Sequence, residues 1–410
     1  MYLPLYLLAL AVFAMGTSEF MLAGLLPDIA SDLGVTVGAA GALTSAFAVG
    51  MAVGAPLMAA VSRNWPPRAC LFGFVLVFAA AHAVGATTGG ATTGFPLLLV
   101  TRVIAALANA GFLAVALTTA AALVPPAQKG RALAVLLSGT TVATIAGVPG
   151  GSLLGTFLGW RATFWAVAAL CVPAAVGILK GIPAHTSQEA NREADQKAER
   201  EAEQGAKSPA PALRSELAQL TRPRLVLVML LGALVNAATF GSFTFLAPVV
   251  TETAGLGRLW ISVVLVLFGI GSLAGVTLAG RLSDRHPGVV LAVGGPLLLI
   301  GWPTLALLAD RPAALLPLVL VQGALSFALG ATLITRVLYE ATGAPTMAGS
   351  YATAALNVGA AVGPLLAATT LDTPAGDRGP LWTSGLLVAL ALPIAYRALG
   401  PLRVGRPPYA

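Results

Sequence analysis

Hydrophobic residues fall into twelve long runs along the chain, separated by polar connections. A helix needs roughly 20 residues to cross the bilayer core, and these runs are about that long. They are uniformly apolar and lack the alternation of barrel strands, so their backbone must satisfy its own hydrogen bonds as helices. The pattern predicts an all-α integral membrane protein with 12 transmembrane helices, near residues 3–26, 40–61, 70–88, 95–118, 130–155, 162–182, 225–248, 259–279, 288–308, 313–338, 346–370 and 380–399.

One polar stretch divides the runs into six and six. The segment Pro183–Arg224 holds seven acidic and seven basic residues, and its charged middle has no apolar stripe that could pack on another helix. We therefore expect a six-helix bundle over residues 1–182, a cytoplasmic charged linker over 183–224 and a second, pseudo-symmetric six-helix bundle over 225–410.

Basic residues are spread unequally between the two sides of the predicted membrane. Cytoplasmic connections carry the excess of Lys and Arg, which places the linker and both termini in the cytoplasm. This topology explains the net charge of +7 without a nucleic-acid partner. Ten basic residues lie on the side of the linker and four on the other, namely Arg63, Arg68, Lys129, Arg131, Arg281, Arg285, Arg336, Arg397, Arg403 and Arg406 against Arg161, Arg258, Arg311 and Arg378.

Little in the sequence favours enzyme chemistry. Cys70 and Cys171 fall in or beside apolar runs, where they are expected to pack rather than to form a disulfide or bind a metal. The chain has no metal-ligand spacing, phosphate-binding loop or nucleophile elbow, so we expect no catalytic residues, no metal and no cofactor. A membrane-bound enzyme or a sensor would need clustered catalytic groups or a folded soluble domain.

The candidate for chemistry is a carboxylate inside the first run, Glu19. A charged side chain at the bilayer centre costs about 2.5–3.5 kcal/mol on insertion scales, so it usually has a task. At about 1.5 Å per residue, Glu19 lies roughly 24 Å from the start of its helix, and Arg102 lies roughly 10 Å below the opposite surface, at a similar depth. We interpret Glu19 as a proton carrier that Arg102 tunes, because a nearby cation favours the charged carboxylate and burial favours the neutral acid. A permanent buried pair that clamps the first and fourth helices is the alternative.

Polar and aromatic side chains near mid-depth are candidates for a substrate cavity. Asn109, Asn236 and Asn357 could orient a moderately polar ligand or equally bond between helices. Aromatic rings could form an apolar wall, or they could face lipid and neighbouring helices. The aromatic candidates are Phe20, Phe47 and Phe240, together with Phe13, Phe243 and Phe245, and His82 is expected to be a packing residue.

Three motifs carry a family resemblance, the first two in a loop of the second half and in the fourth run. Gly280-x-x-x-Asp284-Arg285 resembles the cytoplasmic loop signature of the major facilitator superfamily, which implies a gate latch. The first-half copy, over residues 59–68, departs from that signature. Leu97–Gly111 resembles the fourth-helix signature with its intramembrane arginine, here Arg102, although Ala105 and Ala106 stand where Gln-Gly is usual.

The fifth run carries the most specific motif. Gly139 followed by Gly147-Val148-Pro149-Gly150-Gly151 resembles the fifth-helix signature of drug/proton antiporters, and Gly363-Pro364 is its expected counterpart in the eleventh run. Small residues allow helices to approach closely, and proline bends a helix. The motif thus predicts a closely packed, bendable helix between the halves, although ordinary tight contact in a glycine-rich chain is also compatible.

The segment from Ala11 to Trp165 is similar to actinobacterial chloramphenicol-resistance exporters of the 12-helix drug/proton antiporter family. The resemblance implies a secondary active transporter of the bacterial inner membrane that exports small, largely apolar drugs, phenicols first, in exchange for protons. We expect a monomer. A major facilitator uniporter or symporter for a sugar, nucleoside or other metabolite is the alternative, since fold alone does not fix the direction of transport.

Overall fold

The structure is a computed structural model. It describes residues 3–62, 65–125, 128–182, 216, 218–283, 287–341, 343–344 and 347–399. Within these ranges it contains helices and no strand, and twelve helical segments are long and apolar enough to cross a membrane. The prediction of an all-α protein with twelve spans is confirmed.

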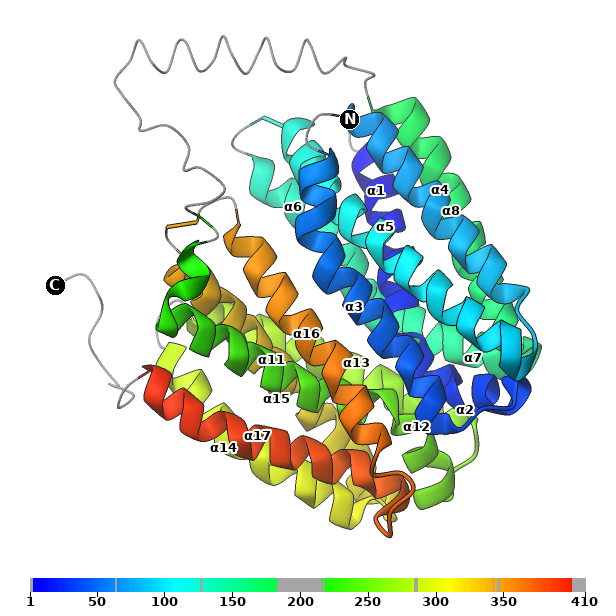
Figure 1. The fold of residues 1–410 in the computed structure, drawn as a ribbon, viewed down its shortest axis with the longest axis vertical. Coiled ribbons are helices and arrows are strands. Elements are labelled where there is room, and N and C mark those ends of the chain that lie inside the picture. The colour runs from blue at the N-terminus through cyan, green and yellow to red at the C-terminus, as the bar shows by residue number, and fades with distance from the viewer. Residues whose placement is uncertain are drawn as a thin grey trace, which may run out of the picture.

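Two groups of helices lie side by side in Figure 1, the first coloured blue to green and the second green to red. We call the side on which the first helix begins the N-terminal face. The first group comprises α1 Leu3–Phe20, α2 Leu22–Leu33, α3 Val37–Val61, α4 Pro67–Ala86, α5 Phe95–Ala122, α6 Lys129–Val142, α7 Val148–Leu158 and α8 Trp160–Gly181. The second comprises α11 Pro223–Thr244, α12 Leu246–Pro248, α13 Leu259–Ser283, α14 Pro287–Leu308, α15 Pro312–Glu340, α16 Ala348–Ala368 and α17 Gly379–Leu399.

Two of the predicted apolar runs are interrupted, namely 3–26 and 130–155. The first apolar run is split at Met21, so that α1 ends one residue after Glu19. The fifth span contains a π-helical turn, Ala143–Gly147, between α6 and α7. Pro149 follows that turn, and its missing N–H removes the hydrogen bond that the carbonyl of Ile145 would otherwise accept. A wider, π-helical turn thus ends two residues before the proline at which the bend is predicted.

The two groups meet along a few helix pairs. α3 packs against α16, α7 against α13, and α2 against α11, α12 and α13. Buried side chains form one large cluster in each group, and a small third cluster joins them through Phe20, Ala48, Phe240, Ala360 and Ala361. The helix that carries Glu19 therefore reaches the boundary between the groups.

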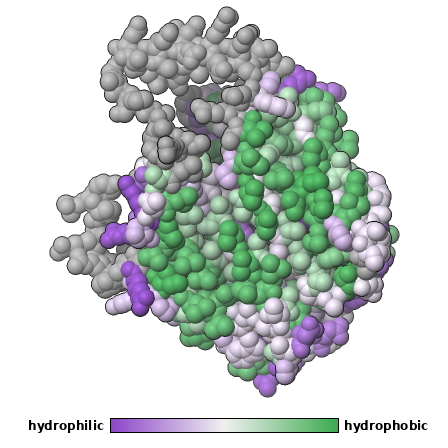
Figure 2. All heavy atoms as spheres, in the orientation of Figure 1, coloured by the Kyte–Doolittle hydropathy of each residue, from purple (hydrophilic) through white to green (hydrophobic). Residues whose placement is uncertain are grey.

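The outer surface suits a lipid environment. Figure 2 shows a broad hydrophobic area over the helices, with hydrophilic residues gathered toward their ends. Large apolar side chains such as Phe157 and Ile300 are 70% and 63% exposed, respectively. Such a continuous apolar surface indicates contact with a membrane rather than with water.

Candidate functional site

Arg102 of α5 binds the end of α1. Its Nη1 donates to Ser18 Oγ at 2.7 Å and its Nη2 donates to the Ser18 carbonyl at 2.9 Å. Ser18 is among the last four residues of α1, where carbonyls without a helical partner favour a cation. The guanidinium carbon also lies 4.3 Å from the centre of the Phe47 ring, and the arginine is 1% exposed. The break at Met21 thus provides the acceptor for a buried charge.

His82 of α4 completes this arrangement. Its Nε2 lies 2.6 Å from Ser18 Oγ, and its Nδ1 lies 2.8 Å from the carbonyl oxygen of Phe78, one turn earlier. The imidazole is 1% exposed and packs against the rings of Phe78 and Phe164, with centroids 4.3 and 5.6 Å away. We call Ser18, His82, Arg102 and Phe47 the arginine site.

The hydrogen bonds of the arginine site have a defined direction. A carbonyl oxygen only accepts, so His82 Nδ1 must carry a proton and donate it to Phe78. Arg102 only donates, so Ser18 Oγ accepts from it. The hydroxyl proton of Ser18 is then free to point at His82 Nε2, which accepts in the neutral imidazole. All of these hydrogen bonds can form when His82 is neutral and Arg102 is charged.

Glu19 directly follows Ser18 in α1. Its side chain is partly accessible, whereas Ser18 and Arg102 are buried. Arg102 is the charged group whose field acts on Glu19. In the part of the chain that the structure describes, these two side chains are nevertheless not joined in an ion pair. The structure therefore brings the two predicted residues near each other, with the guanidinium bound to the neighbour of the carboxylate.

An aromatic pocket lies at the boundary between the helix groups, and Phe20, the residue after Glu19, is part of its lining. The rings of Phe20 and Phe243 have centroids 6.1 Å apart, and Phe243 and Phe268 are separated by 4.7 Å. Phe240 stacks on Phe20 at 5.6 Å. The pocket is lined by Phe20, Thr144 and Val148 from the first group and by Phe243, Leu265, Phe268, Gly269, Ser272 and Phe327 from the second.

The predicted aromatic cavity residues lie partly at the aromatic pocket and partly in the arginine site. Phe20 lines the aromatic pocket and Phe240 packs beside it, whereas Phe47 is 2% exposed beneath Arg102. Phe268 and Phe327 complete the pocket but were not predicted, because a phenylalanine in an apolar helix gives no signal of the face it occupies. Ser18 was not predicted either, because a serine next to a carboxylate does not by itself indicate which group it binds.

The three asparagines have different surroundings. Asn236 of α11 donates from Nδ2 to the Leu356 carbonyl of α16 at 2.7 Å, so it bonds between helices. Asn357 donates to Thr353 of its own helix at 2.9 Å. Asn109 is 1% exposed, and its Oδ1 has no hydrogen-bond partner among the described residues. It lies two turns from Arg102 on the same face of α5, as its spacing of seven residues requires.

The glycines of the predicted motifs mark close contacts between helices. A Cβ on Gly147 would overlap the Thr17 hydroxyl of α1, and one on Gly363 would overlap the Ala237 carbonyl of α11. Gly150 has open space at the same position, and Gly151 has a methyl group of Thr163 at 3.0 Å. The buried prolines Pro149 and Pro364 accompany these contacts in α7 and α16, respectively.

Part of the predicted loop signature lies outside the described residues, namely Asp284 and Arg285. Gly280 in α13 has no atom within 4 Å of the place that a Cβ would take. At the face opposite the N-terminal face, Asp28 of α2 accepts a hydrogen bond from Arg258, which stands just before α13. This ion pair joins the two helix groups.

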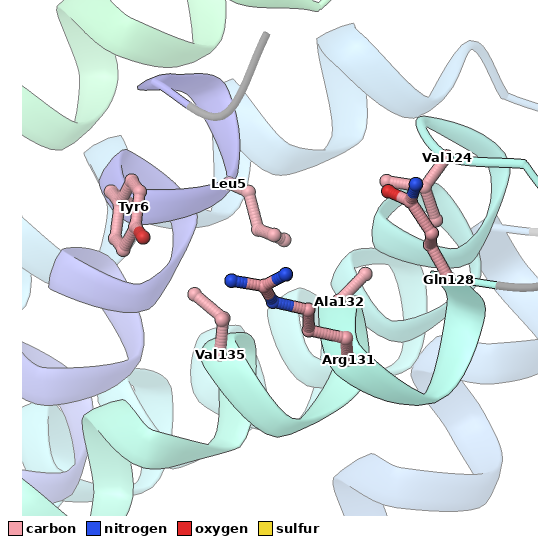
Figure 3. Close-up of a pocket in the computed structure, with 7 residues that line it drawn as sticks. All are labelled: Leu5, Tyr6, Val124, Gln128, Arg131, Ala132 and Val135. Carbon is pink, nitrogen blue, oxygen red and sulfur yellow. The ribbon is translucent and has the colours of Figure 1, made fainter.

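A second pocket lies at the far end of α1. Figure 3 shows the guanidinium of Arg131 lying between Leu5 and Val135, with Tyr6 beyond them. Tyr6 stands 13 residues before Glu19, about 20 Å along the helix, so the pocket does not belong to the arginine site. In the ranges that the structure describes, no group of His, Cys, Asp and Glu could hold a metal ion, and Cys70 and Cys171 are free and buried.

Comparison with known proteins gives consistent matches along the whole chain. A model of the Major Facilitator Superfamily matches residues 8–343 and 229–409. The sequence is 74% identical to a chloramphenicol resistance protein of Streptomyces lividans over 396 residues, which cover 97% of this chain and 96% of that protein. It is 30% identical to the inner membrane transport protein YdhP of Escherichia coli K12, across 96% of this chain and 95% of that protein.

Solved structures share the fold at low sequence identity. A D-xylose-proton symporter matches with a TM-score of 0.71 and 15% identity, covering 98% of both chains. A bacterial homolog of the human lysosomal transporter Spinster, inward-facing and unoccupied, matches with a TM-score of 0.71 and 14% identity, covering 97% of this chain and 96% of that one. At such identities the likeness concerns the fold alone.

Proposed function

Since the chain belongs to the major facilitator superfamily, we propose that it exports small, largely apolar drugs, above all phenicols of the chloramphenicol type, in exchange for protons. A chain of this family is a transporter and not an enzyme. The observation that carries the proposed substrate is the 74% identity to a chloramphenicol resistance protein along almost the whole length. The low-identity likeness to a D-xylose-proton symporter does not favour a sugar substrate, because it concerns the fold alone.

The geometry supports a proton site next to a drug site. Glu19 takes up and releases the proton, and Arg102 tunes its affinity from the adjacent arginine site. The drug occupies the aromatic pocket, whose rings suit a ligand with an apolar, planar ring. The empty volume of the pocket is about 230 Å³ in this structure, so the pocket widens as the bundles rock to admit the drug. Phe20 directly follows Glu19 in the chain and lines that pocket, so occupancy of the pocket and protonation of Glu19 affect each other. Asn109 has an unused acceptor two turns from Arg102 on α5, but it is buried and does not line this pocket, so it meets a polar drug group only when the helices move.

The two bundles, residues 1–182 and 225–410, rock about their shared boundary to expose these sites to one side at a time. The linker, residues 183–224, and both termini lie in the cytoplasm of a bacterial cell, and the N-terminal face is the cytoplasmic face. The chain acts as a monomer. Gly280, Asp284 and Arg285 latch that face, while Gly147, Pro149 and Gly363 keep the moving helices in close contact. Exchange of a neutral drug for one proton moves charge inward, which is worth about 2.3 kcal/mol per 100 mV.

A growth experiment tests the export of drugs. The chain is expressed in a susceptible bacterium that lacks its main pumps, and inhibitory concentrations are measured for a drug panel with and without a protonophore. The proposal expects resistance to phenicols that the protonophore abolishes. Increased accumulation of a nutrient without any drug resistance would instead identify an uptake transporter.

A further inference from the structure

Two buried polar side chains of the arginine site have no place in the exchange described so far. Ser18 and His82 are 0% and 1% exposed, respectively, and both are fully engaged in hydrogen bonds. We propose that they are positioning residues, which hold Arg102 beside Glu19 and prevent the guanidinium from binding the carboxyl group directly. This inference rests on the proposed role of Glu19 as the proton carrier.

Ser18 holds Arg102 in place. The two bonds to Ser18 use Nη1 and Nη2, while Nε has no hydrogen-bond partner in the described part of the chain. The guanidinium therefore keeps a free donor. A carboxylate is a better acceptor for arginine than a hydroxyl or a carbonyl, and it binds the planar fork with two parallel bonds. Since the next residue carries such a group, the observed contact with Ser18 needs a reason.

His82 explains why Arg102 binds Ser18 rather than Glu19. The Phe78 carbonyl fixes the proton of the histidine on Nδ1, which leaves Nε2 as an acceptor 2.6 Å from Ser18 Oγ. The hydroxyl then donates to His82 and presents its lone pairs to Arg102. Without this acceptor, the hydroxyl proton would be free to turn elsewhere and the lone pairs would lose their fixed direction. His82 thus makes Ser18 a reliable acceptor, although it touches neither Glu19 nor Arg102 by a hydrogen bond.

The other charged groups lie at a distance from Glu19. Apart from Arg102 in α5, the charged residues of the helices packed against α1 lie several turns away from Glu19, and α3 and α7 carry none. The thiol of Cys171 in α8 bonds to its own helix at Val167. α11, on the other side of the boundary, has its one charged residue, Arg224, in its first turn. Arg102 and His82 are therefore the titratable groups to consider, and the more distant charged groups are Asp28, Asp32, Arg68, Lys129, Arg131, Arg161 and Lys180.

The consequence is a change in the pH dependence of transport. If Arg102 moves from Ser18 onto Glu19, the cation stabilises the carboxylate, and protonation then needs a more acidic solution. Loss of the histidine acceptor should therefore move the pH of half-maximal transport downward. If His82 served only to fill space, its replacement would lower the amount of folded protein without moving this midpoint.

The experiment measures chloramphenicol uptake, driven by an imposed proton gradient, into everted vesicles over a range of pH. His82→Phe keeps a ring between Phe78 and Phe164 but removes the acceptor, and we expect its midpoint to fall by at least about one pH unit. His82→Gln can donate to Phe78 and accept from Ser18, so it should stay close to the wild-type midpoint. Ser18→Ala removes the hydroxyl but leaves the backbone carbonyl, so a smaller shift in the same direction is expected.

Phe164→Leu is the matched control, because it disturbs the ring contact with His82 and leaves the hydrogen bonds intact. Its midpoint should not move. If His82→Phe does not fold, as judged by monodispersity in detergent, Ser18→Ala carries the test alone. An unchanged midpoint in every folded variant overturns the inference.

Glu19→Gln separates this inference from the proposed function. If Glu19→Gln still transports with wild-type proton coupling, Glu19 is not the carrier and the proposed proton site fails. If Glu19→Gln loses coupling while His82→Phe and Ser18→Ala keep the wild-type midpoint, the proton site stands and the positioning role is wrong.

Discussion

Arg102 donates two hydrogen bonds to Ser18, to its hydroxyl at 2.7 Å and to its backbone carbonyl at 2.9 Å. The two acceptors belong to one residue, and the two donors are the terminal nitrogens of one guanidinium. This contact fixes α5 against the end of α1 and brings a positive charge next to Glu19. It requires the planar fork of an arginine, since an ammonium group is a compact point charge.

Arg102→Lys should therefore impair transport although it preserves the charge. Lysine is shorter and offers one nitrogen in place of two, so we expect it to lose at least one of the two bonds, and a hydrogen bond from a charged donor is worth about 1.5–3 kcal/mol. We expect proton-driven drug uptake into everted vesicles to fall about tenfold or more at equal protein level. Arg131→Lys, at an exposed position near the N-terminal face, is the control and should transport normally. Wild-type uptake by Arg102→Lys would show that the fork geometry is not needed.

The aromatic pocket should set the affinity for drug. Phe243 and Phe268 are 6% and 5% exposed and face each other at 4.7 Å. Replacing either with Ala removes a stacking partner worth about 0.5–1.5 kcal/mol beyond its buried area. We expect KM for chloramphenicol to rise about threefold to tenfold or more, with a smaller change in maximal rate.

Phe157→Ala provides the comparison for these pocket variants. That ring is 70% exposed on α7, so its removal should leave KM unchanged. An equal effect of all three substitutions would mean that the pocket does not hold the drug.

Two neighbouring glycines of the fifth span should tolerate substitution very differently. An added methyl group at Gly147 would overlap Thr17, whereas Gly150 has open space. Overfilling a close contact costs typically about 1–3 kcal/mol. We expect Gly147→Ala to lower the thermal unfolding temperature in detergent and to slow transport, and Gly150→Ala to resemble the wild type in both measurements. The same melting temperature for the two variants would refute the close contact between α1 and the fifth span.

The ion pair between Asp28 and Arg258 should bias the opening of the face on which it lies. Its side chains are 25% and 56% exposed, so the pair is worth at most about 1 kcal/mol. Asp28→Asn should therefore leave folding intact and raise the population open at that face by up to about fivefold. Spin labels at Ser31 and Gly257, one on each side of the boundary, report this population as a longer distance.

The double exchange Asp28→Arg with Arg258→Asp should restore the wild-type distance distribution. Asp310→Asn breaks a pair with Arg378 inside the second group, and it should not change the distribution. If the exchange fails to restore the distances, the pair does not hold the two groups together.

The sequence predicts the spans well because a bilayer demands long apolar runs. It also predicts the depth at which Glu19 and Arg102 lie, since a helix rises by about 1.5 Å per residue. The depth of a residue does not determine the direction in which its side chain points around the helix axis. The runs are apolar on all sides, so no stripe indicates that His82 faces Ser18 or that Phe268 and Phe327 face the boundary. Those relations come from the contacts between helices.

The break at Met21 also has no signal in the sequence. The residues around it, Phe20 to Leu22, include neither glycine nor proline, the usual causes of an interrupted helix. The carbonyl of Ser18 is nevertheless placed at a helix end, where it receives Arg102. An ion pair between Glu19 and Arg102 is a natural expectation from two opposite charges at equal depth. The structure shows instead that a neighbouring hydroxyl and carbonyl take the guanidinium.

The central claim is that Glu19 carries the exchanged proton, and Glu19→Gln tests it most directly. The protein is reconstituted into vesicles that contain a pH-sensitive dye, and an outward or inward gradient of chloramphenicol is imposed. The account predicts that the variant still exchanges labelled for unlabelled drug but no longer moves protons, whereas Glu252→Gln, at an exposed position, moves both. Proton movement by Glu19→Gln at the wild-type rate would contradict it.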